Sequence, residues 1–163
     1  INQAMIEVIK KYNSIEDVKV FFATGKSYYE PIMTELADKQ IVIGKNIYIS
    51  EYIEDMQIYL AAADLVVSRS GALTVSEIAI TGRPSILIPS PNVTGDHQTF
   101  NARAISDKGG AILIEERKLS DDVLFEEIER LRGNRALLEG MGEQAIKCAP
   151  MDAADIIYYS LIT

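Results

Sequence analysis

Short apolar runs alternate along the chain with segments whose apolar residues have helical spacing. Buried strands are predicted by the apolar runs at 18–23, 46–49, 64–68, 84–89 and 111–114. Between the strands, the spacing predicts helices over 2–13, 28–37, 56–63, 73–81 and 96–108. From Ser120 onward it predicts three further helices, the middle one interrupted by glycines and the last opened by Pro150.

This alternation predicts an α/β fold, a doubly wound, Rossmann-like parallel sheet covered by helices on both faces. Such folds bind ligands outside the carboxyl ends of their strands. With 163 residues, the chain has the length of one domain, which we place at 1–163. Because this architecture usually opens with a strand and the chain opens with a helix, we expect a first strand and the following loop upstream of Ile1.

Composition narrows the possible functions. The chain is 48% hydrophobic and 25% charged, which is typical of a globular protein, and no apolar run approaches the ~20 residues of a membrane span. The net charge is −8 without a basic stripe, which argues against a nucleic-acid partner. A single cysteine allows no internal disulfide, and one histidine distant from that cysteine argues against a structural zinc site.

A polar, glycine-containing cluster at 68–77 lies where a predicted strand ends and a helix begins. Gly71 allows a ligand close to the backbone, and the N–H groups of Ala72–Thr74 lack helical acceptors, so they can hold a phosphate. Glu77, one turn into the helix, can accept two hydroxyls from a ribose. The alternative is structural: Ser70 or Thr74 caps the helix and Glu77 completes a capping box.

A second cluster, 89–102, is a loop that follows a strand and leads into a helix. Gln98 and Asn101 share one face of that helix near its start, and their amides can pair with sugar hydroxyls. His97 is the only histidine, so it is a candidate general base, with a solvated or capping histidine as the alternative.

The segment 50–56 follows another strand. The backbone of Ile53 can hydrogen-bond a base edge in a cleft, or its side chain can simply pack into the core. Gly25-Lys26 lacks a phosphate-binding loop pattern and is interpreted as a turn. Tyr158 and Tyr159 are interpreted as packing residues.

Three of these segments, in their order and spacing, closely resemble the MurG family of peptidoglycan N-acetylglucosaminyltransferases. The resemblance rests on Arg69–Ala79 with Gly82–Pro84, on Ile88–Pro91, and on His97-Gln98 followed by Asn101-Ala102-Arg103. It includes Glu51–Met56, extends over essentially the whole chain and concerns only the C-terminal half of the family.

The resemblance implies a GT-B fold, in which two doubly wound domains face each other across a cleft and the C-terminal one binds the UDP-sugar donor. Ile53 would then meet the uracil through its backbone, and Glu77 would accept the ribose hydroxyls. Gln98 would contact the N-acetylglucosamine, with His97 and Asn101 beside it. The diphosphate would lie along Ser70, Gly71, Ala72, Leu73 and Thr74.

The family's Gly-Gly-Ser loop and N-terminal domain are not found in this sequence. The resemblance implies that the N-terminal domain holds the catalytic residues, the acceptor site and the membrane-facing patch, so no catalytic residue is named here. In a GT-B enzyme, a final helix over about 150–163 would cross toward that domain. We expect the chain alone to be inactive.

The implied reaction transfers N-acetylglucosamine from UDP-N-acetylglucosamine to lipid I, forming lipid II with inversion at the anomeric carbon and without a required metal or cofactor. It would serve peptidoglycan synthesis, and through it cell-wall biogenesis, cell shape and cell division. The chain would be cytoplasmic, and the parent enzyme a peripheral protein on the inner face of the bacterial membrane.

Two other hypotheses remain at this point. The chain could be the donor-binding subunit of a two-chain glycosyltransferase, although such a subunit would start with its own Met and first strand. It could also be a non-catalytic nucleotide-binding module of the same fold. Equal affinity for UDP with and without the sugar would favour the module.

Overall fold

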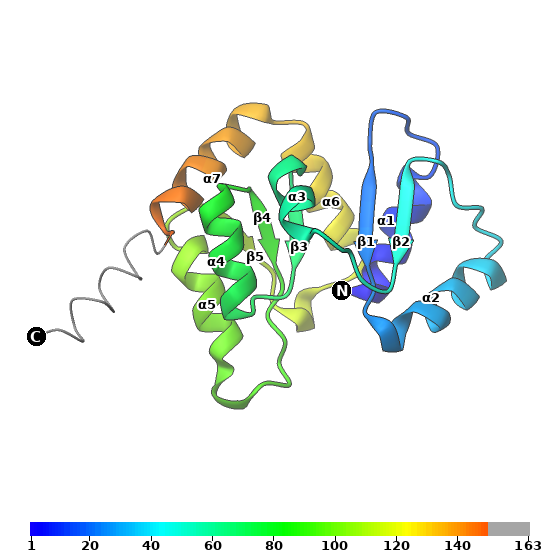
Figure 1. Cartoon of the computed structure of the whole chain (residues 1–163), viewed down its shortest axis with the longest axis horizontal. Coiled ribbons are helices and arrows are strands. Elements are labelled where there is room, and N and C mark those ends of the chain that lie inside the picture. Colours follow the sequence, from blue (N-terminus) through cyan, green and yellow to red (C-terminus); the bar gives the residue numbers. More distant parts are fainter. Residues whose placement is uncertain (150–163) are drawn as a thin grey trace, which may run out of the picture. The chain divides into compact units, whose positions relative to one another are not determined.

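The computed structural model describes residues 1–149, in which strands and helices alternate as the sequence predicts (Figure 1). The strands are β1 (Val20–Ala23), β2 (Ile47–Ser50), β3 (Val66–Ser68), β4 (Ser85–Leu87) and β5 (Ala111–Leu113). The α-helices are α1 (Asn2–Tyr12), α2 (Lys26–Asp38), α3 (Met56–Ala62), α4 (Ala72–Thr81), α5 (His97–Ser106), α6 (Asp121–Arg132) and α7 (Arg135–Lys147). None of these helices is both long and apolar enough to cross a membrane. The predicted helix from Pro150 and the two tyrosines within it lie outside the described residues.

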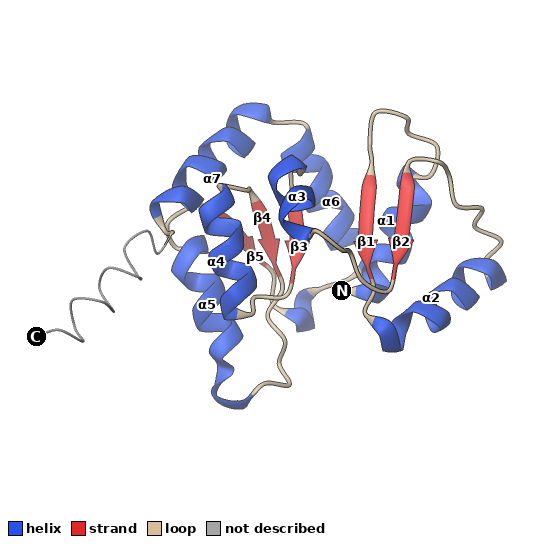
Figure 2. Cartoon of the chain, viewed as in Figure 1, coloured by secondary structure: helices blue, strands red, loops and turns tan. Residues whose placement is uncertain are grey.

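The described chain forms two compact units. The first comprises Ile1–Met56 and Arg117–Arg130, and the second comprises Gln57–Glu116 and the residues from Leu131 on. Each unit has its own sheet, β1-β2 in the first and β3-β4-β5 in the second, and every strand pair is parallel (Figure 2). The predicted α/β class with parallel strands is therefore confirmed, whereas the single domain over 1–163 stays a prediction.

The core of the first unit is built around α1. Its apolar residues recur on one face, where Ile6, Ile9 and Tyr12 are fully buried. The Tyr12 hydroxyl donates a 2.5 Å hydrogen bond to Glu129 on α6, and the Tyr12 ring packs at 5.4 Å from that of Phe125. Tyr12 therefore anchors α6 to α1 with both its ring and its hydroxyl.

In the second unit, the sheet brings three strand ends to one edge. In the register, Ser68 of β3 pairs with Leu87 of β4, which in turn pairs with Leu113 of β5. β4 is the central strand and all its residues are buried. The loops after the three strands therefore start at the same level, at the edge where ligands of doubly wound folds bind.

Strand β4 is shorter than the predicted strand 84–89 because a proline flanks it on each side. Pro84 and Pro89 have no backbone N–H, so neither can donate to a neighbouring strand. Pro84 still accepts a hydrogen bond from Val66, and the Ile88 N–H donates to Ser68, so the ladder runs one residue past the assigned strand.

Helix α5 is shorter at both ends than the predicted helix 96–108. A 3₁₀ turn, Thr94–Asp96, precedes α5, and Asp96 itself has a left-handed backbone with φ of 53°, so the α-helix starts one residue later at His97. Gly82 closes α4 in the left-handed conformation, as predicted.

The predicted interruption of the second C-terminal helix by glycines is wrong, because α7 runs unbroken through Gly140 and Gly142. A Cβ on Gly142 would lie 2.7 Å from the carbonyl oxygen of Gly82, whereas a Cβ on Gly140 would have no neighbour within 4 Å. Gly142 thus lets α7 approach the end of α4 closely, and Gly140 has no such role.

This difference predicts opposite effects for two alanine substitutions in one helix. Gly140→Ala should stabilise the chain by about 0.5–1 kcal/mol through helix propensity alone. Gly142→Ala should destabilise it by roughly 1–3 kcal/mol, because the methyl group forces α7 away from α4. Urea unfolding of the two variants beside the wild type measures both changes, and equal effects would contradict the close approach.

Candidate functional site

The N-terminus of α4 follows directly from the end of β3. Gly71 is the N-cap residue, and the first N–H group bonded within the helix is that of Val75, which donates to the Gly71 carbonyl oxygen at 2.9 Å. The N–H groups of Ala72, Leu73 and Thr74 therefore precede the helical hydrogen-bond ladder. Aligned N–H groups at a helix start form a site for an anion.

The backbone conformation at position 71 does not require a glycine. Its φ is −60°, which any residue can adopt, and a Cβ there would meet only Thr74 Oγ1, at 3.9 Å, among the described atoms. The glycine therefore leaves room at the helix start that the described chain does not fill.

Ser70 does not cap α4. Within residues 1–149, no side chain caps this helix. Ser70 is fully buried, and its hydroxyl donates instead to the carbonyl oxygen of Gln98 at 2.8 Å. The Asn101 amide nitrogen donates to the Ser70 carbonyl oxygen at 3.0 Å. The capping-box alternative for Ser70 is therefore wrong, and these two hydrogen bonds join the start of α4 to α5.

The side chain of Gln98 has a fixed orientation. Its Oε1 accepts a 2.9 Å hydrogen bond from the backbone N–H of Ser90, in the loop after β4. Because a backbone N–H can only donate, the oxygen must face Ser90 and the amide nitrogen must face the other way. Gln98 therefore has two N–H donors that this bond does not use.

His97 and Glu77 lie on the two helices that meet at this edge. His97 is the exposed first residue of α5, next to Gly95, whose Cβ would lie 3.0 Å from the imidazole Nε2. Asp96, not His97, is the N-cap residue of α5. Glu77 is half-buried on α4, and its helical spacing from Leu73 and Thr74 places it on their face.

Ile53 belongs to the first unit, in the loop after β2. Its side chain is 6% exposed, so the core-packing alternative is confirmed for the side chain, while the backbone role stays a prediction. Gly25, also in that unit, has a φ of 81° and is the N-cap residue of α2, which confirms the predicted turn.

Arg69 connects all three strand ends in the second unit. Its Nη1 donates to the carbonyl oxygens of Ile88 and Pro89, each at 3.2 Å. Two further bonds, at 2.5 and 2.7 Å, form a bidentate pair with the carboxylate of Glu116, just past β5. The sequence shows Arg69 only as part of a motif and gives no sign of a role for Glu116, because the two residues lie 47 positions apart.

The Arg69 guanidinium also stabilises the ionised form of Glu116. Its hydrogen bonds stabilise the carboxylate, and together with its positive charge they outweigh the cost of partial burial, so the pKa of Glu116 lies below its ordinary value. Both side chains are about one-third exposed, so solvent screens the pair. The ion pair therefore contributes little to stability, and its main effect is to orient the Arg69 side chain.

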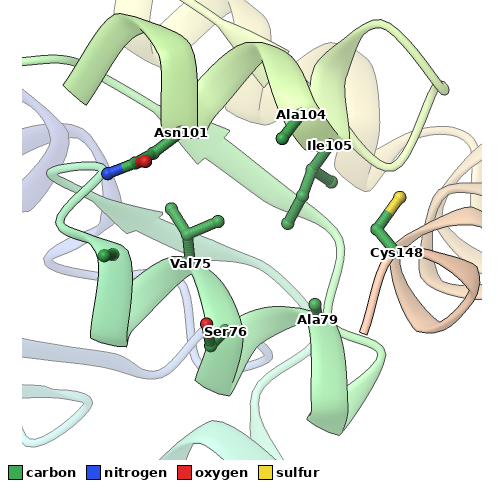
Figure 3. Close-up of a pocket in the computed structure, with 8 residues that line it drawn as sticks. Val75, Ser76, Ala79, Asn101, Ala104, Ile105 and Cys148 are labelled. Atoms are coloured by element: carbon green, nitrogen blue, oxygen red, sulfur yellow. The ribbon is translucent and has the colours of Figure 1, made fainter. Parts of the chain in front are cut away.

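A groove of about 220 Å³ between α4 and α5 is a separate feature (Figure 3). Val75 from α4 and Ile105 from α5 point toward one another across it, and Cys148 closes one end. Of the predicted site residues, only Ala72 and Asn101 line it. The groove is therefore not the predicted binding site. Among residues 1–149, no three His, Cys, Asp or Glu side chains are grouped to hold a metal ion.

Comparison with known proteins identifies the family. The model of the glycosyltransferase family 28 C-terminal domain matches residues 1–157. The chain belongs to this family.

The similar proteins are longer than this chain. It is 42% identical over 160 residues to the UDP-N-acetylglucosamine–N-acetylmuramyl-(pentapeptide) pyrophosphoryl-undecaprenol N-acetylglucosamine transferase of Desulforamulus reducens, covering 96% of the chain but 43% of the relative. A protein of the same name from Acetivibrio thermocellus is 43% identical, with 97% and 42% covered. The chain spans less than half the length of both relatives.

The crystal structure of Acinetobacter baumannii MurG is similar over 96% of this chain and 44% of its own, with a TM-score of 0.77 and 30% identity. This similarity confirms the expected fold of a GT-B C-terminal domain, and it supports the resemblance to MurG found in the sequence.

The lowered pKa of Glu116 predicts how its ion pair responds to acid. A folded-state pKa below the unfolded value of about 4.3 adds stability that is complete above that value and lost as pH falls through the folded pKa. Glu116→Gln removes this titration. The difference in free energy of unfolding between wild type and variant should therefore be constant near neutral pH and shrink below about pH 4.3. Urea unfolding at a series of pH values measures it, and a difference independent of pH would contradict the pair.

Proposed function

We propose that the chain is the donor-binding part of an inverting glycosyltransferase that transfers N-acetylglucosamine from UDP-N-acetylglucosamine to lipid I, producing lipid II. Family membership and the names of the relatives support this reaction. The observation that favours it most is local: an α4 N-terminus with free space at Gly71 belongs to the same hydrogen-bonded network as a Gln98 amide fixed by Ser90.

The diphosphate of the donor would lie at the start of α4, along Ser70, Gly71, Ala72, Leu73 and Thr74. Its charge would be stabilised by N–H groups that point out of the helix, and that stabilisation grows as the UDP leaving group gains charge. Preformed donors of this kind need no reorganisation during the reaction.

The sugar and ribose would be recognised by side chains of α4 and α5. Glu77 would accept two ribose hydroxyls, since an ionised carboxylate can only accept hydrogen bonds. Gln98 would donate from its amide nitrogen to hydroxyl oxygens of N-acetylglucosamine. His97 is exposed at the start of the same helix and would lie beside the sugar, whereas Asn101 would act through the Ser70 carbonyl that it already binds.

The remaining contacts would come from outside the second unit. The backbone of Ile53, in the first unit, would meet the uracil. The base that activates the acceptor, the lipid I site and the membrane contact would lie in an N-terminal domain of the parent enzyme. That enzyme would act at the inner face of the bacterial membrane, and this chain alone would bind donor without turnover.

Replacing Glu77 tests the ribose contact. Glu77→Ala should weaken the binding of UDP-N-acetylglucosamine and UDP alike by about 10- to 100-fold, because hydrogen bonds to a charged group contribute about 1.5–3 kcal/mol. Calorimetric titration measures both affinities. Glu139→Ala, which removes a carboxylate from α7 in the same unit, is the matched control and should bind as the wild type does. An unchanged affinity in Glu77→Ala would contradict the assigned role.

Replacing Gln98 by glutamate tests the sugar contact alone. The carboxylate of Gln98→Glu can still accept the hydrogen bond from Ser90, but it has no N–H to donate to the sugar. We expect the affinity for UDP-N-acetylglucosamine to fall by about tenfold, while the affinity for UDP changes by no more than about twofold. Should the wild type bind UDP as tightly as the UDP-sugar, the non-catalytic nucleotide-binding module would be the better description.

A further inference from the structure

A continuous set of hydrogen bonds leads from Glu116 to Gln98. The Glu116 carboxylate holds the Arg69 guanidinium at two points, and Arg69 Nη1 reaches the carbonyl oxygens of Ile88 and Pro89. The next residue, Ser90, donates its N–H to Gln98 Oε1. The Arg69 bonds join the segments after β3, β4 and β5, and the Ser90 bond joins the loop after β4 to the start of α5.

Glu116 follows β5, and the hydrogen bonds described above do not join its carboxylate directly to Gln98. The guanidinium offers a path between them, because its Nη1 and Nη2 bind the carboxylate while Nη1 also donates to the two carbonyl oxygens. Without the carboxylate, the cationic guanidinium would lose the two hydrogen bonds that fix its orientation.

We propose that Glu116 is a positioning residue for sugar selection, acting through Arg69 on the amide of Gln98. The inference rests on the proposed function, because it assigns Gln98 to the sugar of the donor. Glu116 itself touches no part of the donor in this account. It fixes the loop after β4, and that loop fixes the orientation in which Gln98 presents its N–H groups.

This role predicts an unusual signature in Glu116→Ala. The loop loses one of its anchors, so Gln98 presents its donors less often in the correct place and the sugar adds less affinity. The released guanidinium, adjacent to Ser70 and Gly71 in the sequence, is a cation that can reach toward a diphosphate. The affinity for UDP should therefore stay the same or increase, while the affinity for UDP-N-acetylglucosamine should exceed it by less than in the wild type.

The experiment compares the wild-type chain with Glu116→Ala and Glu139→Ala. Both variants remove one carboxylate from an arginine pair in which the closest N–O distance is below 3 Å, but Glu139 lies on α7 and has no part in the series. Calorimetric titrations give the dissociation constants for UDP and for UDP-N-acetylglucosamine, and the first divided by the second measures the preference for the sugar. We expect this ratio to fall by about tenfold in Glu116→Ala and to be unchanged in Glu139→Ala.

Hydrogen exchange supplies a readout that needs no donor. The Ser90 amide should exchange about tenfold faster in Glu116→Ala, because its acceptor is less firmly placed. The Val75 amide, bonded to Gly71 in the first turn of α4, should exchange at the wild-type rate. Unchanged exchange at Ser90 would overturn the proposed coupling.

The affinity data separate the possible failures. An equal loss of UDP and UDP-sugar binding in Glu116→Ala would mean that the ion pair merely supports the fold, and it would overturn the inference. A retained sugar preference in that variant would overturn it too, while leaving the proposed function intact. A wild-type chain that binds neither compound would contradict the proposed function, and the role of Glu116 in sugar selection would fail with it.

Discussion

The parallel register of β3, β4 and β5 is the constraint on which the candidate site depends. Because Ser68, Leu87 and Leu113 pair side by side, the three chains leave the sheet at the same level. The groups assigned to the donor's diphosphate and sugar depend on three segments beyond these residues: the turn into α4, the loop into α5, and the short segment that ends in Glu116. Arg69 joins the three with hydrogen bonds to backbone and carboxylate.

This arrangement explains how an acidic chain could bind an anionic ligand. The net charge of −8 is spread over the whole sequence, whereas the start of α4 presents three backbone N–H groups that no side chain of the described residues caps. The positive charge of Arg69 is largely matched by Glu116 rather than offered to a ligand. In this account the diphosphate is held by the helix terminus, and selection of the sugar is left to Gln98.

The elements were predictable because their signals are local. Apolar runs indicated the strands, helical spacing indicated the helices, and Gly82 indicated the end of α4 from the sequence alone. The N-cap residue of α4 was harder to predict, because Ser70, Gly71 and Thr74 all suit that position. In the structure Gly71 is the N-cap residue, and the buried Ser70 hydroxyl donates to the Gln98 carbonyl oxygen on another helix.

The remaining features depend on contacts that no local pattern shows. Glu116 meets Arg69 only because β5 lies beside β4, and nothing in the sequence around either residue points to the pairing. Likewise, α7 runs unbroken through its glycines, and the close approach of Gly142 to the end of α4 is a contact between distant segments.

The most direct test of the central claim is to locate UDP-N-acetylglucosamine by following backbone and side-chain amide resonances during a titration. We expect the largest shifts at the N–H groups of Ala72–Thr74 and at the side-chain amide of Gln98, with the sugar responsible for the Gln98 shift. Shifts confined to Val75, Ile105 and Cys148 would place the ligand in the groove between α4 and α5 instead, and would contradict the assignment of the donor to the edge of the sheet.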